Sequence, residues 1–322
     1  MVGCGGEAFV RRFNSLGMRP TKAAWRSRSP KRSGSRPRSV SGPASRPRSR
    51  WSLAQIVALV ALLVPAGARA GELPLVDAHI HYSHDAWETL PPEQAVGLLR
   101  AAGLKQAFVS SSSDEGTQKL HAVAPDLVVP VLRPYRRRGE ISTWMRDETV
   151  VAHVEARLAK HRYAGIGEFH VHGAEADLPV VRRLVELAKA GGLFLHVHSD
   201  AEAIQRIFAQ DPDARVLWAH AGFENAETIR ALLESYRTLW ADLAFRSDHA
   251  AGGEGDPAWR ALFSDFAERF LVGTDTYTPE RWHEVAAHAS WTRDWLSTLP
   301  AEVAEKIAHR NAEALARWPG AE

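Results

Sequence analysis

Two histidines separated by one residue, His79 and His81, have types and spacing that could do chemistry. They end an apolar run that reads as a buried strand, and side chains two residues apart on a strand share a face. Asp77 lies one layer deeper on that face, where it could orient a ligand. A divalent metal would satisfy one ring nitrogen of each buried imidazole, and hydrogen bonds to loop backbone would do so as well. This segment alone leaves both interpretations open.

Four more apolar runs end in groups that could bind a metal or carry a proton. Their last residues are Gly167-Glu168-Phe169-His170, His196-Val197-His198, His220-Ala221-Gly222 and Gly273-Thr274-Asp275. Each group has another interpretation. Glu168 could pair with a loop arginine, His220 could be an ordinary core histidine, and Asp275 could cap the helix expected to follow it.

Eight short apolar runs alternate with amphipathic helical segments after residue 70. Helices are expected at 93–102, 150–161, 179–190, 225–235 and 301–318, with Gly103 and Gly191 where helices stop. Eight strand–helix units in 252 residues predict the α/β class and a (β/α)8 TIM barrel. A doubly wound open sheet is the alternative, but no glycine-rich phosphate loop follows the first strand. The expected strands are residues 75–81, 105–111, 127–132, 164–170, 193–198, 215–220, 239–245 and 270–275.

The carboxyl ends of the strands in such a barrel meet at one mouth. Histidines and carboxylates that are far apart in the sequence would therefore form one cluster. His196 and His198 share a face of the fifth strand. We predict that His198, nearer the mouth, is the ligand, and His196 is the alternative.

These motifs together resemble the amidohydrolase superfamily, and more closely its amidohydrolase-related branch. The resemblance covers roughly residues 74–317, and Asn311-Ala312-Glu313 is similar to the family's closing helix. Many relatives bridge two metals with a carboxylated lysine, but Lys160 belongs to the preceding helix, so Glu168 would have to supply the bridge. The resemblance implies one or two divalent ions, because members with a single metal also exist. Zinc is the expected metal. The implied ligands are His79, His81 and Asp275 for one ion and His198 and His220 for a second, with Glu168 between them.

The resemblance implies a metal-dependent hydrolase, in which a metal-bound hydroxide attacks an amide, lactone, ester or phosphoester. Asp275 is then expected to be the catalytic proton acceptor and donor as well as a ligand. A metal-dependent decarboxylase, a lyase of the same superfamily, is the alternative. A non-catalytic metal-binding protein of the periplasm is a third hypothesis.

Three side chains beside strand ends are predicted to bind substrate: Arg133, His170 and Arg246. The two arginines could recognise an anionic group on a small molecule. Arg136, Arg137 and Arg138 are expected to form a solvated charged loop instead. The sequence leaves the identity of the substrate open.

Residues 1–70 are predicted to be a basic leader plus a secretory signal peptide. Residues 11–50 are rich in Arg, Ser and Pro, and the apolar run 53–64 precedes the small residues Ala68 and Ala70. We expect cleavage after Ala70, leaving residues 71–322 as a hydrolase barrel that is exported, either periplasmic or secreted. An uncleaved anchor is the alternative. Because the leader is long for a signal, a start at Val40 is a further hypothesis.

Removal of the leader reverses the charge of the protein. The chain has 40 Lys and Arg and 38 Asp and Glu, of which residues 1–70 hold 14 and 1, leaving 26 and 37 and a net charge of about −11. An acidic domain argues against nucleic acid or an anionic membrane as partner. The single cysteine, Cys4, leaves with the leader, so His and carboxylate must hold any metal. We expect a small-molecule substrate and no membrane partner after cleavage, and the sequence leaves open whether the protein is a homo-oligomer.

Overall fold

The computed structural model describes residues 72–250 and 255–317. All eight predicted strands are present, and each begins within one residue of its predicted start, although β1, β2, β6, β7 and β8 end earlier than predicted. The (β/α)8 barrel is confirmed, and the open-sheet alternative is wrong. The strands are β1 (Leu75–Ile80), β2 (Leu104–Val109), β3 (Val128–Leu132), β4 (Gly165–His170), β5 (Phe194–His198), β6 (Val216–Trp218), β7 (Leu239–Asp242) and β8 (Phe270–Leu271).

The strands are parallel and pair in chain order from β1 to β8. Backbone hydrogen bonds then join the end of the sheet to its beginning. The Ala78 N–H donates to the Val272 carbonyl at 2.8 Å, and the Asp275 N–H donates to the His79 carbonyl at 2.8 Å. The segment that carries Asp275 is therefore fastened to the strand that carries the first histidine pair.

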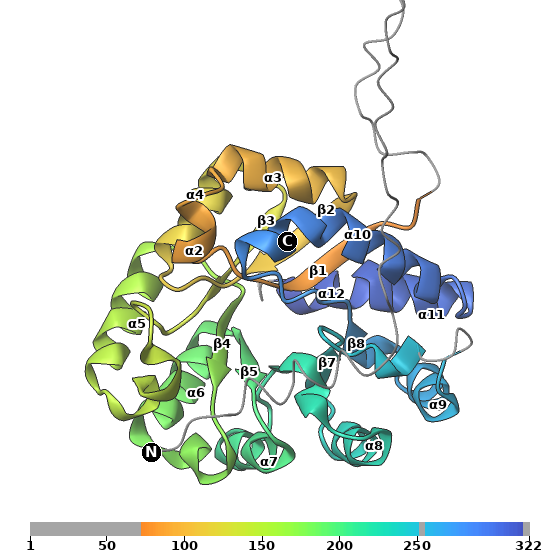
Figure 1. The fold of residues 1–322 in the computed structure, drawn as a ribbon. Helices are drawn as coiled ribbons and strands as arrows, with labels where there is room; N and C mark the ends of the chain where they lie inside the picture. The colour runs from red at the N-terminus through yellow and green to blue at the C-terminus, as the bar shows by residue number, and fades with distance from the viewer. Residues whose placement is uncertain (1–71, 251–254, 318–322) are drawn as a thin grey trace, which may run out of the picture. The chain divides into compact units, whose positions relative to one another are not determined.

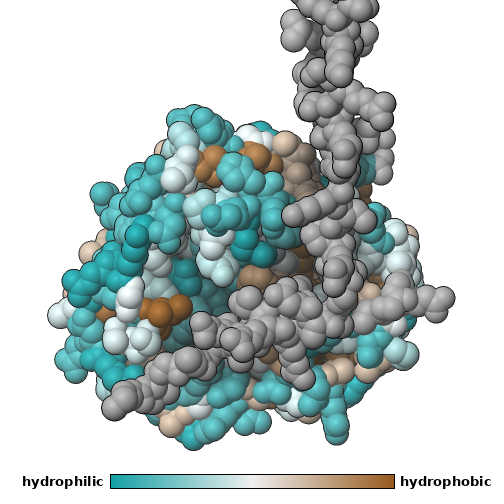
Figure 2. Space-filling view, in the orientation of Figure 1, coloured by the Kyte–Doolittle hydropathy of each residue, from teal (hydrophilic) through white to brown (hydrophobic). Residues whose placement is uncertain are grey.

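Helices surround the strands (Figure 1), and the face of the barrel seen in Figure 2 is mainly hydrophilic outside the grey residues. Helix α6 ends at Gly191, and Gly192, with φ of 63°, takes the left-handed conformation that stops it, one residue later than predicted. No helix in residues 72–250 or 255–317 is long and apolar enough to cross a membrane. The helices that follow or precede strands are α2 (His84–Trp87), α3 (Pro92–Ala101), α4 (Glu115–Val123), α5 (Thr149–Lys160), α6 (Pro179–Gly191), α7 (Ala201–Gln210), α8 (Ala226–Ser235), α9 (Pro257–Asp265) and α10 (Pro279–Leu296).

The predicted last helix, residues 301–318, is three consecutive pieces. A π-helical turn, Lys306–Arg310, separates α11 (Ala301–Glu305) from α12 (Asn311–Ala316). The Asn311 side chain donates to the carbonyls of Ala267 and Phe270, both at 2.8 Å, so it fastens this helix to the segment leading into β8.

An apolar layer lies beneath the mouth of the barrel. Two of its residues precede polar mouth residues by two positions, since Phe108 precedes Ser110 and Phe194 precedes His196. Its strand residues are Val76, Ala78, Phe108, Val131, Phe194, Leu217 and Leu271, and Ala312 and Leu315 of α12 pack with them.

The predicted leader, the cleavage point after Ala70 and the domain boundary there lie outside the described residues.

Candidate metal centre

The strand ends bring the predicted ligands together in one cluster. His79 and His81 come from β1, Glu168 from β4, His198 from β5, His220 from the turn after β6, and Asp275 from the segment after β8. All except His198 expose less than a tenth of their surface. Buried charges and imidazoles in such number need partners, and here the partners are mainly one another.

Four ligand atoms of this cluster lie close together. They are Nε2 of His79, Nε2 of His81, Oε2 of Glu168 and Oδ1 of Asp275, and five of their mutual distances are 3.1 to 3.6 Å. Zinc bonds to nitrogen and oxygen of about 2.0 to 2.2 Å place tetrahedral ligand atoms roughly 3.3 to 3.6 Å apart. The spacing of this donor set therefore fits a small divalent cation.

Hydrogen bonds on the outer side of three histidines set which nitrogen faces the cluster. Nδ1 of His79 lies 3.1 Å from Oδ2 of Asp242, Nδ1 of His220 lies 3.0 Å from the Ala244 carbonyl, and Nδ1 of His81 contacts the Ser110 carbonyl. An Nδ1–H that donates outward leaves the Nε2 lone pair pointing inward, which is the arrangement of a metal-ligating histidine.

Carboxylate oxygens packed this closely in a buried cluster are stabilised by a positive charge next to them. Burial alone would lower the pKa of His79, but the carboxylates of Asp275, Asp242 and Glu168 outweigh it and raise that pKa well above its usual value. Burial opposes ionisation of Asp275 as well, yet the neighbouring imidazoles of His79 and His81 hold the pKa of this carboxyl below its ordinary range. A proton or a divalent cation can supply this charge, and the donor set suits the cation.

The same two carboxylates face a second group of imidazoles with their other oxygens. Oε1 of Glu168 lies 2.8 Å from Nδ1 of His198 and 3.8 Å from Nε2 of His220, which is also 3.8 Å from Oδ2 of Asp275. Glu168 is therefore placed between two sets of histidines. His198 differs from the other three because it meets the carboxylate through Nδ1.

Glu168 is also paired with an arginine, as the alternative interpretation of this residue expected. Arg133 donates from Nη2 to Oε2 at 2.8 Å and from Nε to the Glu168 carbonyl at 3.1 Å. Burial opposes ionisation of Glu168, but the charges of His170, His79 and Arg133 hold its pKa well below the ordinary value. The pairing and the position in the cluster occur together, so Arg133 holds the carboxylate in place.

Asp242 at the end of β7 is part of the centre, although the sequence analysis did not select it. Its Oδ2 lies 3.1 Å from Nδ1 of His79 and 3.0 Å from Nε2 of His196, and its Oδ1 accepts from the N–H groups of His220 and Ala244. Burial lowers the pKa of His196 to about 4, so this imidazole is neutral at pH 7. The two histidines of the fifth strand differ in their partners, since His196 faces Asp242 whereas His198 faces Glu168, and the choice of His198 as the ligand stays a prediction. A carboxylate at a strand end was the available signal, the same one that selected Asp275.

The segment carrying Asp275 is held by its own hydrogen bonds. Thr278 caps α10, so Asp275 is not the helix cap. Asp77 accepts from the N–H groups of His79 and Thr274 and from the Thr274 hydroxyl, and burial raises its pKa to about 6. Asp77 was predicted to orient a ligand, but its hydrogen bonds hold the backbone next to Asp275 and do not reach the ring of a ligand.

Backbone strain accompanies two of the cluster residues. His220 has φ of 56° and Asp275 has φ of 48°, in the left-handed region that residues with a Cβ rarely occupy. Residues held in that region cluster at functional sites, where the surrounding contacts maintain them. Arg281 supplies such contacts, because its guanidinium donates to the carbonyls of Thr274 and Asp275.

Arg246, predicted to bind substrate, forms its hydrogen bonds with other residues of the protein. It donates to both oxygens of Asp248 at 2.9 and 2.7 Å and to the carbonyls of His220 and Glu224, and it is 5% exposed. We correct that prediction: Arg246 joins the segments that follow β6 and β7.

His170 and Tyr135 border the open side of the cluster. The Tyr135 hydroxyl accepts from the His170 N–H at 2.8 Å and lies 2.9 Å from Nδ1 of the same residue, while Nε2 lies 3.9 Å from Oε1 of Glu168. A cavity of about 220 Å³ adjoins this side and is lined by Arg133, Tyr135, Ser83, His84 and Ser112 among others. His170 itself does not line this cavity, so its contact with substrate stays a prediction.

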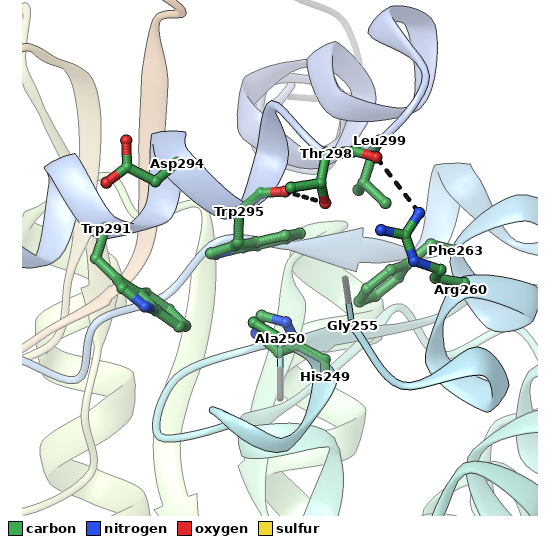
Figure 3. Close-up of a pocket in the computed structure, with 10 residues that line it drawn as sticks. All are labelled: His249, Ala250, Gly255, Arg260, Phe263, Trp291, Asp294, Trp295, Thr298 and Leu299. Carbon is green, nitrogen blue, oxygen red and sulfur yellow. Dashed lines mark hydrogen bonds between the residues drawn. The ribbon is translucent and has the colours of Figure 1, made fainter. Parts of the chain in front are cut away.

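A second cavity, of about 200 Å³, lies between the segment after β7 and helices α9 and α10 (Figure 3). Both His249 and Trp295 line it, with ring centroids 4.4 Å apart, and none of the cluster residues does. It is therefore separate from the candidate metal centre.

Comparisons with known proteins agree with this fold. A family model described as Amidohydrolase matches residues 76–318. A comparison with curated protein sequences found no match.

Solved structures with the same fold are similar to most of the chain. An uncharacterised TIM-barrel protein from Bordetella bronchiseptica has a TM-score of 0.55 at 16% identity, with 76% of this chain and 98% of that chain covered. A 2-pyrone-4,6-dicarboxylic acid hydrolase, described as putative, from Pseudomonas putida has a TM-score of 0.50 at 17% identity, covering 76% and 98%. An amidohydrolase from Burkholderia multivorans with bound zinc has a TM-score of 0.50 at 14% identity, covering 76% and 99%.

Proposed function

Because the chain belongs to the amidohydrolase family, we propose that it is a metal-dependent hydrolase that cleaves an amide, lactone, ester or phosphoester with activated water. One observation carries the proposal. Two imidazole nitrogens lie 3.1 Å apart in a buried cluster, and each lies 3.2 to 3.6 Å from one oxygen of Glu168 and one oxygen of Asp275, which is the spacing of zinc ligands.

One ion would be held by His79, His81, Glu168 and Asp275. A second would be held by His198 and His220 on the opposite oxygen of Glu168. A divalent metal bound in this way lowers the pKa of water toward neutrality and polarises the bond under attack. The donor set contains only nitrogen and oxygen, which is compatible with zinc.

Asp275 is the proposed proton carrier. Its carboxylate is ionised at neutral pH and touches both sets of histidines through different oxygens, so it can accept the proton of the attacking water. The same group then returns the proton to the leaving group. Arg133 keeps Glu168 charged and oriented, and His170 contacts the substrate from the open side of the cluster.

Metal content tests the binding half of the proposal. Elemental analysis of the protein purified without chelator should show one or two equivalents of zinc or another divalent metal. The double variant His79→Ala plus His81→Ala should lose it, because two of the four ligand atoms that lie close together are removed. The matched control is His283→Ala plus His288→Ala, two histidines of α10 outside the cluster, which should retain the metal. Equal metal content in all three proteins would refute the proposal.

Turnover tests the catalytic half. The metal-loaded protein should hydrolyse at least one class in a panel of lactones, amides, esters and phosphoesters, and the double variant should not. Carbon dioxide release without hydrolysis would replace the hydrolase with the decarboxylase alternative. Bound metal with neither reaction would favour the non-catalytic metal-binding protein.

A further inference from the structure

Three exposed aromatic side chains stand beside the metal centre, each just after one of three consecutive strands. Phe223 follows His220 by three residues, Phe245 follows Asp242 by three, and Tyr277 follows Asp275 by two. They are 50%, 40% and 46% exposed and make up half of the large hydrophobic residues that are exposed in the described part of the chain. We call these three residues the aromatic rim.

The aromatic rim is continuous with the cluster. The Phe223 ring stacks on the His220 ring with centroids 4.7 Å apart and an angle of 18°, and the Phe245 ring lies 5.8 Å from the same imidazole. Tyr277 lies 6.5 Å from Phe245. Single exposed hydrophobic residues are common on proteins, but a contiguous set against a buried polar site marks a binding surface.

The backbone holds two of these rings outward at a conformational cost. Phe223 has φ of 55° and Phe245 has φ of 56°, a region that is strained for a bulky residue. Two arginines maintain the strained segments. Arg246 donates to the carbonyls of His220 and Glu224 on either side of Phe223, and the Arg281 guanidinium packs 4.4 Å from the Phe245 ring. Fixed strain that exposes apolar surface is expected where that surface has a use.

The arginines on the opposite side of the mouth are already paired with carboxylates of the protein. In the loop after β3, Arg136 is bonded to Glu140 and Asp147, Arg137 to Glu140, and Arg138 to Asp85. These charges are therefore largely neutralised within the protein. The aromatic rim, on the side of β6 to β8, is therefore a better-defined contact surface than the arginine loop, and it suits an apolar, ring-shaped part of a substrate.

We propose that the aromatic rim binds a ring-bearing apolar group of the substrate, next to the bond that is broken at the cluster. This assignment rests on the proposed hydrolase function and adds a substrate class to it. Phe223 and Phe245 are the specificity-determining residues, since their exposed rings lie against His220.

Binding of a product-like acid tests the proposal without turnover. On the metal-loaded protein, 3-phenylpropionate should bind more tightly than propionate by calorimetry. An aromatic contact contributes about 0.5 to 1.5 kcal/mol beyond buried area, so Phe223→Ser and Phe245→Ser should each weaken 3-phenylpropionate about three- to tenfold and leave propionate unchanged. Trp291→Ser is the matched control, an aromatic residue 45% exposed on α10 away from the mouth, and should change neither affinity.

Turnover gives a second measurement. Dihydrocoumarin and δ-valerolactone differ in one fused ring, and the ratio of their kcat/KM values should fall about three- to tenfold in the two Phe variants. Unchanged affinity ratios, or equal losses for both acids, would overturn the assignment. So would dissociation of a dimer by the Phe variants with unchanged ratios, because the rim would then cover a second copy. Rim-dependent binding without hydrolysis of any substrate would support the rim and refute the hydrolase.

Discussion

At the scale of single residues, the centre depends on carboxylates that each serve two partners. Glu168 and Asp275 both turn one oxygen to the His79 and His81 pair and the other to His220. Asp242 acts behind them, holding two imidazoles and two backbone N–H groups at once. A change at any of the three carboxylates therefore alters several contacts. Which atoms are lost determines whether metal binding or proton transfer is impaired.

The variant Asp275→Asn should separate proton transfer from metal binding. Asn keeps the size and one ligand oxygen but cannot accept the proton, so kcat should fall about 10² to 10⁴-fold while metal content falls less. The measurement is kcat on whichever substrate the panel identifies, with elemental analysis of the same sample. Near wild-type turnover would assign proton transfer elsewhere, with His170 to be tried next. Parallel loss of metal and activity would show Asp275 to be a ligand only.

The variant Asp242→Asn tests the residue behind the metal ligands. Removing the charge that orients Nδ1 of His79 should weaken zinc binding about 10 to 100-fold, the usual effect of losing such a partner. Competition with a chromophoric chelator measures this affinity. Asp211→Asn is the control, since Asp211 is a buried aspartate bonded to Lys189 outside the cluster, and its zinc affinity should equal that of the parent. Equal affinities in all three proteins would contradict the role of Asp242.

At the scale of elements, short segments after the strands do most of the positioning. Arg246 and Arg281 bind the carbonyls of the segments after β6 and β8, and they hold His220 and Asp275 in strained conformations. Gly273 permits this close packing, because a Cβ there would lie 3.1 Å from Cβ of His79 and 3.2 Å from Oδ1 of Asp242. The segment after β7 contributes differently, by burying His249 among aromatic rings.

The buried His249 should make stability depend on pH. Within the described part of the chain neither ring nitrogen has a hydrogen-bond partner, and burial lowers the pKa from 6.5 to about 4. The unfolded chain therefore binds a proton between pH 6.5 and 4 that the folded chain does not, so the free energy of unfolding falls as the pH falls through this window. The full difference corresponds to about 3 kcal/mol.

His249→Phe removes this titration and fits the surrounding rings of Trp259, Phe263 and Trp295. Denaturant unfolding at pH 6.5 and pH 4.5 should show a smaller loss of stability in the variant than in the parent. Comparing the two proteins removes the contribution of the metal centre, which is common to both. The exposed His283→Phe should behave as the parent does. Identical pH dependence of parent and His249→Phe would contradict this prediction.

At the scale of the whole molecule, we propose that the protein is exported and cut after Ala70. The first strand begins at Leu75, so cleavage there would leave the barrel intact. Mass spectrometry of the periplasmic or secreted fraction should find a chain that begins at Gly71, with the net charge of about −11 that the sequence predicts. Ala68→Asp should block the cut, because small residues are required at that position. A full-length chain in the cytoplasm would contradict export and the acidic-surface interpretation.

The sequence alone determined the barrel and most of the residues at its mouth. Strand periodicity and strand–helix alternation depend on local spacing, so each strand start was predictable, and strand ends carrying His or carboxylate pointed to Glu168, His220 and Asp275. Tertiary structure decided which atoms face one another. His196 and His198 are predicted to share a face of the fifth strand, yet one faces Asp242 and the other Glu168.

The roles of the arginines could not be predicted from the sequence for a similar reason. Arg133 and Arg246 both follow a strand end, but Arg133 holds Glu168 whereas Arg246 joins two loops. A guanidinium has a long side chain and several donors, so its partners depend on carbonyls and carboxylates brought near it by other strands. Ligand types are properties of the residues, but the partners of each ligand are set by contacts between residues more than a hundred positions apart, such as Asp242 with His79.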